Sequence, residues 1–327
     1  MRPWPISIED VTAARQRLRP YLTMTPLRSF PLLDAELDVH AFVKCENHQP
    51  TNAFKVRNAL SALTGLEESQ RAQGVVAAST GNYGQGLAWA GRALSVAVTI
   101  CVPESANPDK VAAIRSFGAQ LVMEGRDYDE ALEVMHRLVR QRGLCPLHGV
   151  NHPLIPAGAG TMTLEILEQV QMADQSIDAM VIAIGGGSQA VGAMTVLRAM
   201  RPEVAVYGVG AAGAPTMYEA WQKRRPHAGA TPTTFAEGVA TRQTYELTFD
   251  ALCQGLAGFV LVTDREIAEA VRLLWQTTHN LVEPAGAVGV AGLKKLSERL
   301  QGQAVALILS GANMDLATLR RVVNEDA

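Results

Sequence analysis

Short runs of aliphatic residues alternate with segments of helical periodicity along most of the chain. One block predicts strands at 74–78, 94–102 and 120–123 with helices over 82–93 and 108–117. A second block predicts strands at 177–184, 204–209 and 304–309 with helices over 188–200, 217–222 and 264–279. Strands that alternate with helices form βαβ units, and unbroken aliphatic strands are typical of parallel sheets that are buried on both faces.

This pattern predicts an α/β fold with two lobes, each an open, mostly parallel sheet flanked by helices. Residues 74–148 form the smaller lobe in this interpretation, and residues 1–73 together with 149–327 form the larger one. A chain of 327 residues is long enough for two linked lobes.

Composition narrows the class of protein. Hydrophobic residues make up 48% of the chain and aromatic residues only 5%, which favours an aliphatic α/β core. A net charge of −3 without a basic, aromatic-rich stripe argues against nucleic acid as a partner. The four cysteines form no CxxC pair, the start of the chain lacks an apolar leader, and no uninterrupted membrane span follows. We therefore expect reduced thiols in a soluble, cytoplasmic protein with no membrane partner.

Three turns at the predicted carboxyl ends of strands combine small residues with polar side chains. They cover residues 79–83, 185–188 and 310–313. Open α/β sheets bind their ligands at this edge, so the three turns are expected to converge on one ligand.

The turn Gly185-Gly186-Gly187-Ser188 predicts a phosphate site. Glycines let backbone N–H groups approach an anion, and the following helix N-terminus adds positive potential. A tight βα turn without a ligand is the simpler alternative. A dinucleotide site would need an acidic residue at the end of the next strand, but that strand ends Tyr207-Gly208-Val209-Gly210. The turn therefore favours a monophosphate.

Lys55 follows Phe54 near the start of a predicted helix. Burial lowers the pKa of a lysine and makes its amine a usable nucleophile, which a Schiff base with an aldehyde cofactor requires. Most lysines are surface charges, so this segment alone leaves both alternatives open.

Two other segments leave both a functional and a purely structural interpretation open. Residues 79–83 suit a substrate carboxylate but also fit an ordinary helix N-cap. Glu283-Pro284 also fits the start of a helix. No HxxxH, CxxC or EF-hand spacing predicts a metal site.

Taken in order, these segments resemble the fold-type II pyridoxal-phosphate enzymes, and within them the threonine/serine dehydratase and serine racemase branch. The matching segments are Lys44-x-Glu46-x-x-Gln49-x-Thr51-x-x-Phe54-Lys55-x-Arg57, Ser79-Thr80-Gly81-Asn82, Gly158-x-Gly160-Thr161-x-x-Leu164-Glu165-Ile166, Gly185-Gly186-Gly187, Glu283-Pro284-x-Gly286-Ala287 and Ser310-Gly311-x-Asn313.

The resemblance implies a fold like that of the tryptophan synthase β subunit, with pyridoxal 5'-phosphate as cofactor. The large lobe then binds the cofactor, and the small lobe, residues 74–148, closes over the substrate. The implied catalytic residue is Lys55, which carries the cofactor and acts as general base on Cα. The implied cofactor-binding residues are Phe54, Lys55, Asn82, Gly185, Gly186, Gly187, Ser188, Glu283 and Ser310. The implied substrate-binding residues are Ser79, Thr80, Gly81, Asn82, Tyr83 and Ala159.

Ser310 bears on the reaction class. In the resembling family this position faces the pyridine nitrogen, and a hydroxyl there does not favour a protonated ring. An unprotonated ring is a weaker electron sink, which suits the expulsion of a β-leaving group as Cα loses its proton.

Several residues depart from the family pattern. Ser188 and Gln189 stand where a glycine and an aliphatic residue are usual, Asn58 replaces a glycine, Tyr83 a histidine and Ala159 a glutamine. The changes at 83 and 159 leave the substrate side chain open, and an aromatic or hydroxyaspartate-like one fits this interpretation.

Two more departures concern alternative activities. Racemases of this branch carry serine where this chain has Thr80, so racemisation is at best a side activity. The acid of the branch's divalent-cation site is replaced by Gly210, so no metal site of that kind is expected. The regulatory domain of biosynthetic threonine dehydratases is also not expected.

The prediction is a pyridoxal-phosphate ammonia-lyase that converts a 3-hydroxy amino acid to a 2-keto acid and ammonia, as a homodimer by family resemblance. Another β-elimination or β-replacement enzyme, or a racemase, is the alternative among enzymes. A pyridoxal-phosphate or amino-acid binding protein is the alternative outside them.

Overall fold

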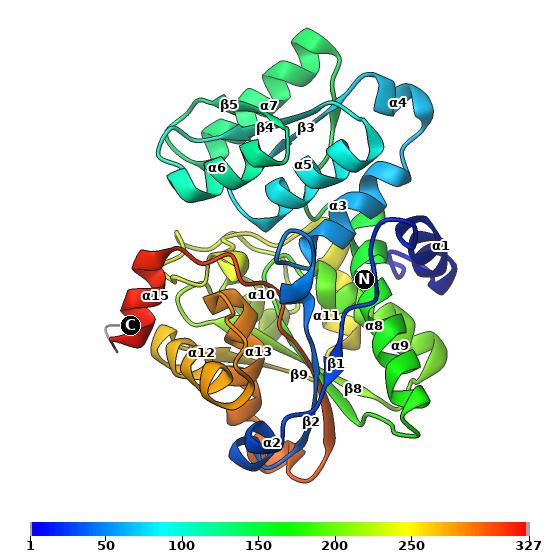
Figure 1. Ribbon diagram of the computed structural model, residues 1–327, viewed down its shortest axis with the longest axis vertical. Coiled ribbons are helices and arrows are strands. Elements are labelled where there is room, and N and C mark those ends of the chain that lie inside the picture. The colour runs from blue at the N-terminus through cyan, green and yellow to red at the C-terminus, as the bar shows by residue number, and fades with distance from the viewer. Residues whose placement is uncertain (1, 325–327) are drawn as a thin grey trace.

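The structure, a computed structural model, describes residues 2–324. Two sheets organise this part of the chain, one above the other in Figure 1. The larger sheet has six strands in the order β1-β2-β10-β7-β8-β9, all paired in parallel except β1 with β2. The smaller sheet has four parallel strands in the order β5-β4-β3-β6. The predicted fold class is confirmed.

The strands of the larger sheet are β1 (Leu27–Arg28), β2 (His40–Lys44), β7 (Ala179–Ala183), β8 (Ala205–Ala211), β9 (Gly258–Val262) and β10 (Ala304–Ile308). Those of the smaller sheet are β3 (Val75–Ala78), β4 (Val98–Val102), β5 (Gln120–Met123) and β6 (Cys145–Pro146). The α-helices are α1 (Ile8–Leu18), α2 (Pro31–Leu37), α3 (Lys55–Thr64), α4 (Glu68–Ala72), α5 (Asn82–Leu94), α6 (Pro108–Ser116), α7 (Tyr128–Arg142), α8 (Leu154–Met172), α9 (Ser188–Met200), α10 (Thr216–Lys223), α11 (Glu246–Gly255), α12 (Asp264–Thr278), α13 (Pro284–Lys295), α14 (Ser297–Leu300) and α15 (Leu316–Val323). Short 3₁₀ helices span Glu46–His48 (η1) and Glu237–Val239 (η2).

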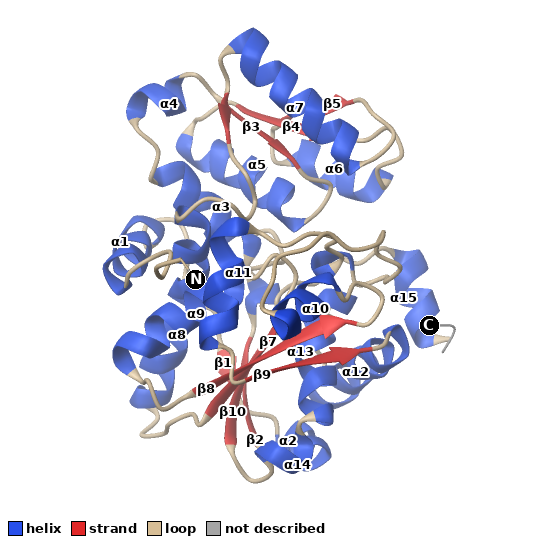
Figure 2. Ribbon diagram, turned by 180° about the vertical axis from the view of Figure 1, so that it is seen from behind, coloured by secondary structure: helices blue, strands red, loops and turns tan. Residues whose placement is uncertain are grey.

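The central strands of the larger sheet are covered on both faces. Met180 and Ile182 of β7 pack against α8 and α9, whereas Ala179 and Val181 pack in the opposite cluster with α12 and α13. Figure 2 shows the fan of strands with helices on both sides. Because side chains alternate along a strand, burial of both faces requires an unbroken aliphatic run, which is the pattern of the sequence.

Helix α3 joins the two halves of the molecule. Its Val56, Leu60 and Leu63 share a core with the smaller sheet. On the other side it packs on α8 at Gly158, where an added Cβ would lie 2.5 Å from the carbonyl oxygen of Arg57. The residues at the start of α3 are therefore fixed from both lobes.

Several element boundaries differ from the prediction by a few residues, and two of these differences have a clear cause. The aliphatic run from Leu94 does not begin a strand, because Ser95 adopts a left-handed conformation that ends α5 and β4 starts only at Val98. Strand β8 continues past Val209, so Gly210 lies inside it and Ala211 pairs with Val262. In both cases hydrophobicity and glycine content alone cannot locate the turn, which depends on the neighbouring strand.

Other local predictions are confirmed. Thr263 and Glu266 form the predicted capping box at the start of α12. All four cysteines are buried and free. In residues 2–324, the helices lack the combination of length and apolar composition that crossing a bilayer demands.

Candidate active site

A cavity of about 530 Å³ lies between the two sheets, at the carboxyl ends of their strands. It is lined by residues of both lobes: Lys55, Ser79, Thr80, Gly81, Asn82, Tyr83, Lys110, Asp127, Tyr128, Thr231, Pro232, Glu237, Gly238, Ala240, Thr241, Arg242, Gln243, Tyr245, Glu283 and Asn313. A smaller recess, lined by Phe54, Lys55, Asn82, Ala183, Gly185, Gly186, Gly187, Ser188, Gln189, Gly238, Val239, Glu283, Ala285 and Ser310, opens beside it. The three predicted turns thus converge on Lys55.

Lys55 is the first residue of α3, and the backbone before it is tied to β10. The N–H of Phe54 donates to the carbonyl oxygen of Ser310 at 2.9 Å, and Ala53 forms an isolated bridge with Gly311. The Lys55 ammonium lies 4.9 Å from the centre of the Phe54 ring. Burial lowers the pKa of Lys55 to about 8, and the nearby Glu283 carboxylate opposes the shift. Roughly a tenth of the amine is therefore neutral near pH 7.

Glu283 faces Lys55 across the recess. Burial raises the pKa of Glu283 to about 7, although a hydrogen bond from Asn82 opposes that shift. The bond joins Asn82 Nδ2 to Glu283 Oε1 at 2.6 Å, and Asn313 Nδ2 donates in turn to Asn82 Oδ1 at 2.8 Å. A Cβ at Gly311 would lie 2.4 Å from Glu283 Oε1, so glycine is what lets the carboxylate reach this position.

The loop of residues 79–82 presents polar groups at the N-terminus of α5. Ser79 Oγ accepts from the N–H groups of Gly81 at 3.3 Å and Gly84 at 3.1 Å, which fixes the turn. A Cβ at Gly81 would meet open space. The helix N-terminus favours an anion here, as predicted for a substrate carboxylate.

The glycine turn 185–187 is a narrow cradle. A Cβ at Gly185 would lie 2.7 Å from the oxygen of Gly238, and one at Gly186 would lie 2.5 Å from Val150. Gly187 has φ +85°, a conformation that favours glycine. Thr248 Oγ1 donates to the oxygen of Gly186 at 2.7 Å and holds that carbonyl.

Two further observations indicate an anion in this cradle. Within residues 2–324, no backbone acceptor is found for the N–H groups of Gly185, Gly186 and Gly187. The buried Nε2 of Gln189, which lines the recess, also lacks a partner there. A dianionic phosphate at the N-terminus of α9 would satisfy these donors.

A buried ion network fixes the orientation of α3. Arg57 donates to Glu46 at 2.8 and 2.9 Å and to Glu165 at 2.6 and 2.8 Å. Lys44 Nζ lies 2.7 Å from Glu165. The four side chains come from β2, η1, α3 and α8, so the sequence motif around Glu165 serves α3 and does not reach the cavity.

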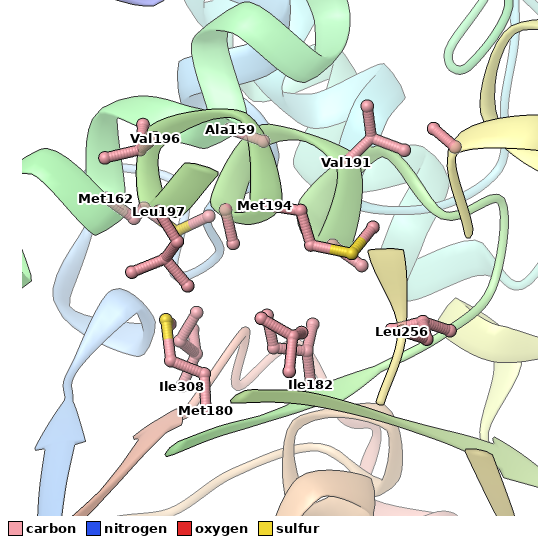
Figure 3. Close-up of a cluster of buried hydrophobic side chains, with 14 of the residues drawn as sticks. Ala159, Met162, Met180, Ile182, Val191, Met194, Val196, Leu197, Leu256 and Ile308 are labelled. Atoms are coloured by element: carbon pink, nitrogen blue, oxygen red, sulfur yellow. The ribbon is translucent and has the colours of Figure 1, made fainter. Parts of the chain in front are cut away.

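Ala159 does not reach the cavity either. It lies on α8, is 1% exposed and packs in the core with Met162 and Met194, as Figure 3 shows. The structure therefore corrects the prediction that Ala159 lies beside the substrate. The flanking glycines explain its place: Gly158 faces α3, and a Cβ at Gly160 would meet Val11 and Gly192. A helix packed between three others has no face left for the site.

Thirteen of the residues that line the cavity were not predicted as site residues, among them Lys110, Tyr128, Tyr245 and Asn313. Tyr128 and Tyr245 stand at or just before the starts of α7 and α11. No local pattern distinguishes them from ordinary helix-flanking residues. Asn313 lies in the predicted turn 310–313, and this turn could have identified it as a site residue.

Comparison with known proteins identifies the family to which the chain belongs. A family model described as "Pyridoxal-phosphate dependent enzyme" matches residues 18–311. The chain belongs to this family of pyridoxal-phosphate dependent enzymes, within the fold-type II threonine/serine dehydratase branch. The predicted family and cofactor are confirmed.

Individual proteins of known activity or structure are similar to nearly the whole chain. The L-threo-3-hydroxyaspartate ammonia-lyase of Pseudomonas sp is 35% identical over 310 residues, 95% of this chain and 96% of that protein. The L-threonine ammonia-lyase of Thermotoga maritima is 34% identical over 321 residues, 98% of this chain and 79% of that protein. The crystal structure of a threonine deaminase from T.th. superposes with a TM-score of 0.90 at 35% identity, covering 95% of this chain and 99% of that one.

The residues present fit pyridoxal phosphate. The N–H groups of the glycine cradle suit its phosphate, and the Lys55 amine with its lowered pKa suits its aldehyde. Asn82, Glu283 and Ser310 surround the space between these two points.

Proposed function

We propose that this enzyme is an ammonia-lyase that removes water from a 3-hydroxy amino acid and yields a 2-keto acid and ammonia. Elimination takes the proton from Cα and the hydroxyl from Cβ. The resulting enamine then takes up one water molecule and loses ammonia, so water balances over the whole reaction. Ammonia-lyases among the relatives, at 34 to 35% identity over nearly the whole chain, support this reaction class.

Pyridoxal phosphate, when bound, supplies an electron sink that acidifies the Cα proton of the amino acid. Phe54, Asn82, Glu283, Ser310 and the cradle 185–188 would hold it. Ser310 would supply a hydroxyl for the ring nitrogen, and this hydroxyl would limit the electron sink and so favour elimination.

The side chains of the cavity have separate roles in this proposal. The loop 79–82 binds the substrate carboxylate through the N-terminus of α5. Lys55 removes the proton from Cα, which its amine can do because a neutral fraction exists near pH 7. The half-buried Lys55 beside the carboxylate loop is the single observation that carries the proposal.

Replacement of Lys55 tests the reaction. K55A should lower the release of keto acid from 3-hydroxy amino acids by at least about a thousandfold, because both the cofactor attachment and the base are lost. The exposed Lys294 of α13 gives a matched control, and K294A should leave the rate unchanged. Keto-acid production by K55A at the wild-type rate would exclude the proposal.

We also propose that residues 74–148 close over the substrate as a unit, and that the enzyme works as a cytoplasmic homodimer. Three polar contacts across the cavity support closure. Asn82 meets Glu283, Asn107 Nδ2 donates to Asp315 Oδ2 at 2.7 Å, and Lys110 pairs with Glu237.

A further inference from the structure

The hydroxyl of Tyr83 is buried in the cavity wall without a partner. Tyr83 follows Asn82 in the first turn of α5, and its side chain is 6% exposed. Within the described residues its hydroxyl meets no hydrogen-bond partner, although the residue lines the cavity. A buried hydroxyl is normally satisfied by protein, ordered water or a ligand, and because Tyr83 lines the cavity we take a ligand bound there as the partner.

Two more tyrosines share this wall. Tyr128 and Tyr245 line the same cavity from the starts of α7 and α11. Burial, with a smaller contribution from Tyr245, raises the pKa of Tyr128 to about 12. Burial and then Tyr128 raise the pKa of Tyr83, and all three tyrosines line the same cavity. They remain protonated at physiological pH and are available as hydrogen-bond donors.

The rest of the site leaves this wall for the substrate side chain. In the proposed function, on which this inference rests, loop 79–82 takes the carboxylate and the amino group lies at Lys55. A tetrahedral Cα held at these two points directs Cβ and its substituent to the remaining wall of the cavity. Tyr83, Tyr128 and Tyr245 are among the lining residues that remain there, together with others such as Lys110, Arg242 and Gln243.

We propose that these three tyrosines form a side-chain subsite, and that the substrate is a 3-hydroxy amino acid whose side chain continues beyond Cβ to a hydrogen-bond acceptor. The methyl group of threonine and the phenyl ring of phenylserine offer the Tyr83 hydroxyl no hydrogen-bond acceptor beyond Cβ. An amide or carboxylate oxygen would pair with it. Tyr83 is then a specificity-determining residue.

The test compares Y83F with the wild type on threonine, 3-hydroxyasparagine, 3-hydroxyaspartate and phenylserine. Wild-type kcat/KM should be highest for 3-hydroxyasparagine or 3-hydroxyaspartate. Y83F should lower kcat/KM for that substrate at least about tenfold more than for threonine, because a site built to hydrogen-bond a group discriminates strongly by it. Tyr21 is exposed and outside the cavity, so Y21F should change neither value.

Three results would overturn the subsite. These are a preference for threonine, a preference for phenylserine, or an equal loss on all four substrates in Y83F, which indicates a structural role alone. Failure of the proposed function has a different signature, since then no member of the panel releases ammonia. In that case the subsite is tested by binding. Each amino acid is titrated into the protein, and the concentration that half-saturates the change in cofactor absorbance is measured. Y83F should raise this concentration at least about tenfold more for 3-hydroxyasparagine or 3-hydroxyaspartate than for threonine.

Discussion

At the scale of single residues, burial sets the chemistry of Lys55 and Glu283. Each lies in a recess where its charged form is disfavoured, so the lysine pKa falls to about 8 and the glutamate pKa rises to about 7. Their mutual attraction opposes both shifts without cancelling them. Both groups therefore titrate closer to neutral pH than an isolated lysine and glutamate would.

The raised pKa of Glu283 predicts a pH-dependent stability difference for E283Q. Between about pH 4.5 and 7 the unfolded chain loses this proton while the folded protein keeps it, so the wild type loses stability as pH rises. The free energy of unfolding of E283Q relative to wild type should rise over this range by up to about 3 kcal/mol and then level off. Urea unfolding of the cofactor-free protein measures it.

A surface glutamate serves as the control. Glu298 of α14 is exposed, and E298Q should show no such rise. A flat difference for E283Q between pH 4.5 and 7 would mean that the carboxyl titrates normally in the folded protein.

At the scale of elements, the position of α3 depends on charges that never touch the cavity. Arg57 holds Glu46 of η1 and Glu165 of α8, and Gly158 lets α8 approach closely enough for these bonds. Removing one partner of a buried ion pair leaves the other charge uncompensated.

E165Q should therefore lower the free energy of unfolding by about 3–5 kcal/mol. Glu168 on the same helix gives a matched control, because its pair with Arg15 is partly exposed. E168Q should cost less than about 1 kcal/mol. Chemical denaturation of both variants decides the matter, and equal losses would contradict a special role of the buried network.

At the scale of the whole molecule, the two lobes meet through polar contacts across the cavity. Lys110 of α6 pairs with Glu237 of η2, and Asn107 joins α6 to Asp315 before α15. Such contacts favour a closed arrangement only modestly, because Glu237 is largely exposed. If the small lobe closes as proposed, the balance between open and closed states is thus easily shifted.

E237Q should shift this balance toward the open state. We expect KM to rise about threefold to fivefold, since a single ion pair of this exposure contributes less than about 1 kcal/mol. Small-angle scattering should show a larger radius of gyration than for wild type when no amino acid is present. E124Q breaks the Glu124–Arg137 pair inside the small lobe and should change neither quantity. An unchanged KM in E237Q would show that this contact does not control closure.

The sequence by itself predicted the architecture and the cofactor, and it indicated the residues that we propose hold this cofactor. Alternating aliphatic and amphipathic segments predict parallel sheets because burial on both faces constrains every position of a strand. The glycines of 185–187 and the motif around Lys55 can also be recognised in the sequence. Close approach of the backbone to an anion requires glycine, and a buried nucleophilic amine requires lysine.

Only the tertiary structure decided the substrate end. The sequence placed Tyr83 near the substrate, but Tyr128 and Tyr245 join it in the cavity lining from separate helices, and no local pattern links the three residues. Ala159 was predicted beside the substrate but lies in the core, because the packing of α8 against α1, α3 and α9 fixes the direction of its side chain. Side-chain convergence depends on long-range packing, which composition and periodicity do not encode.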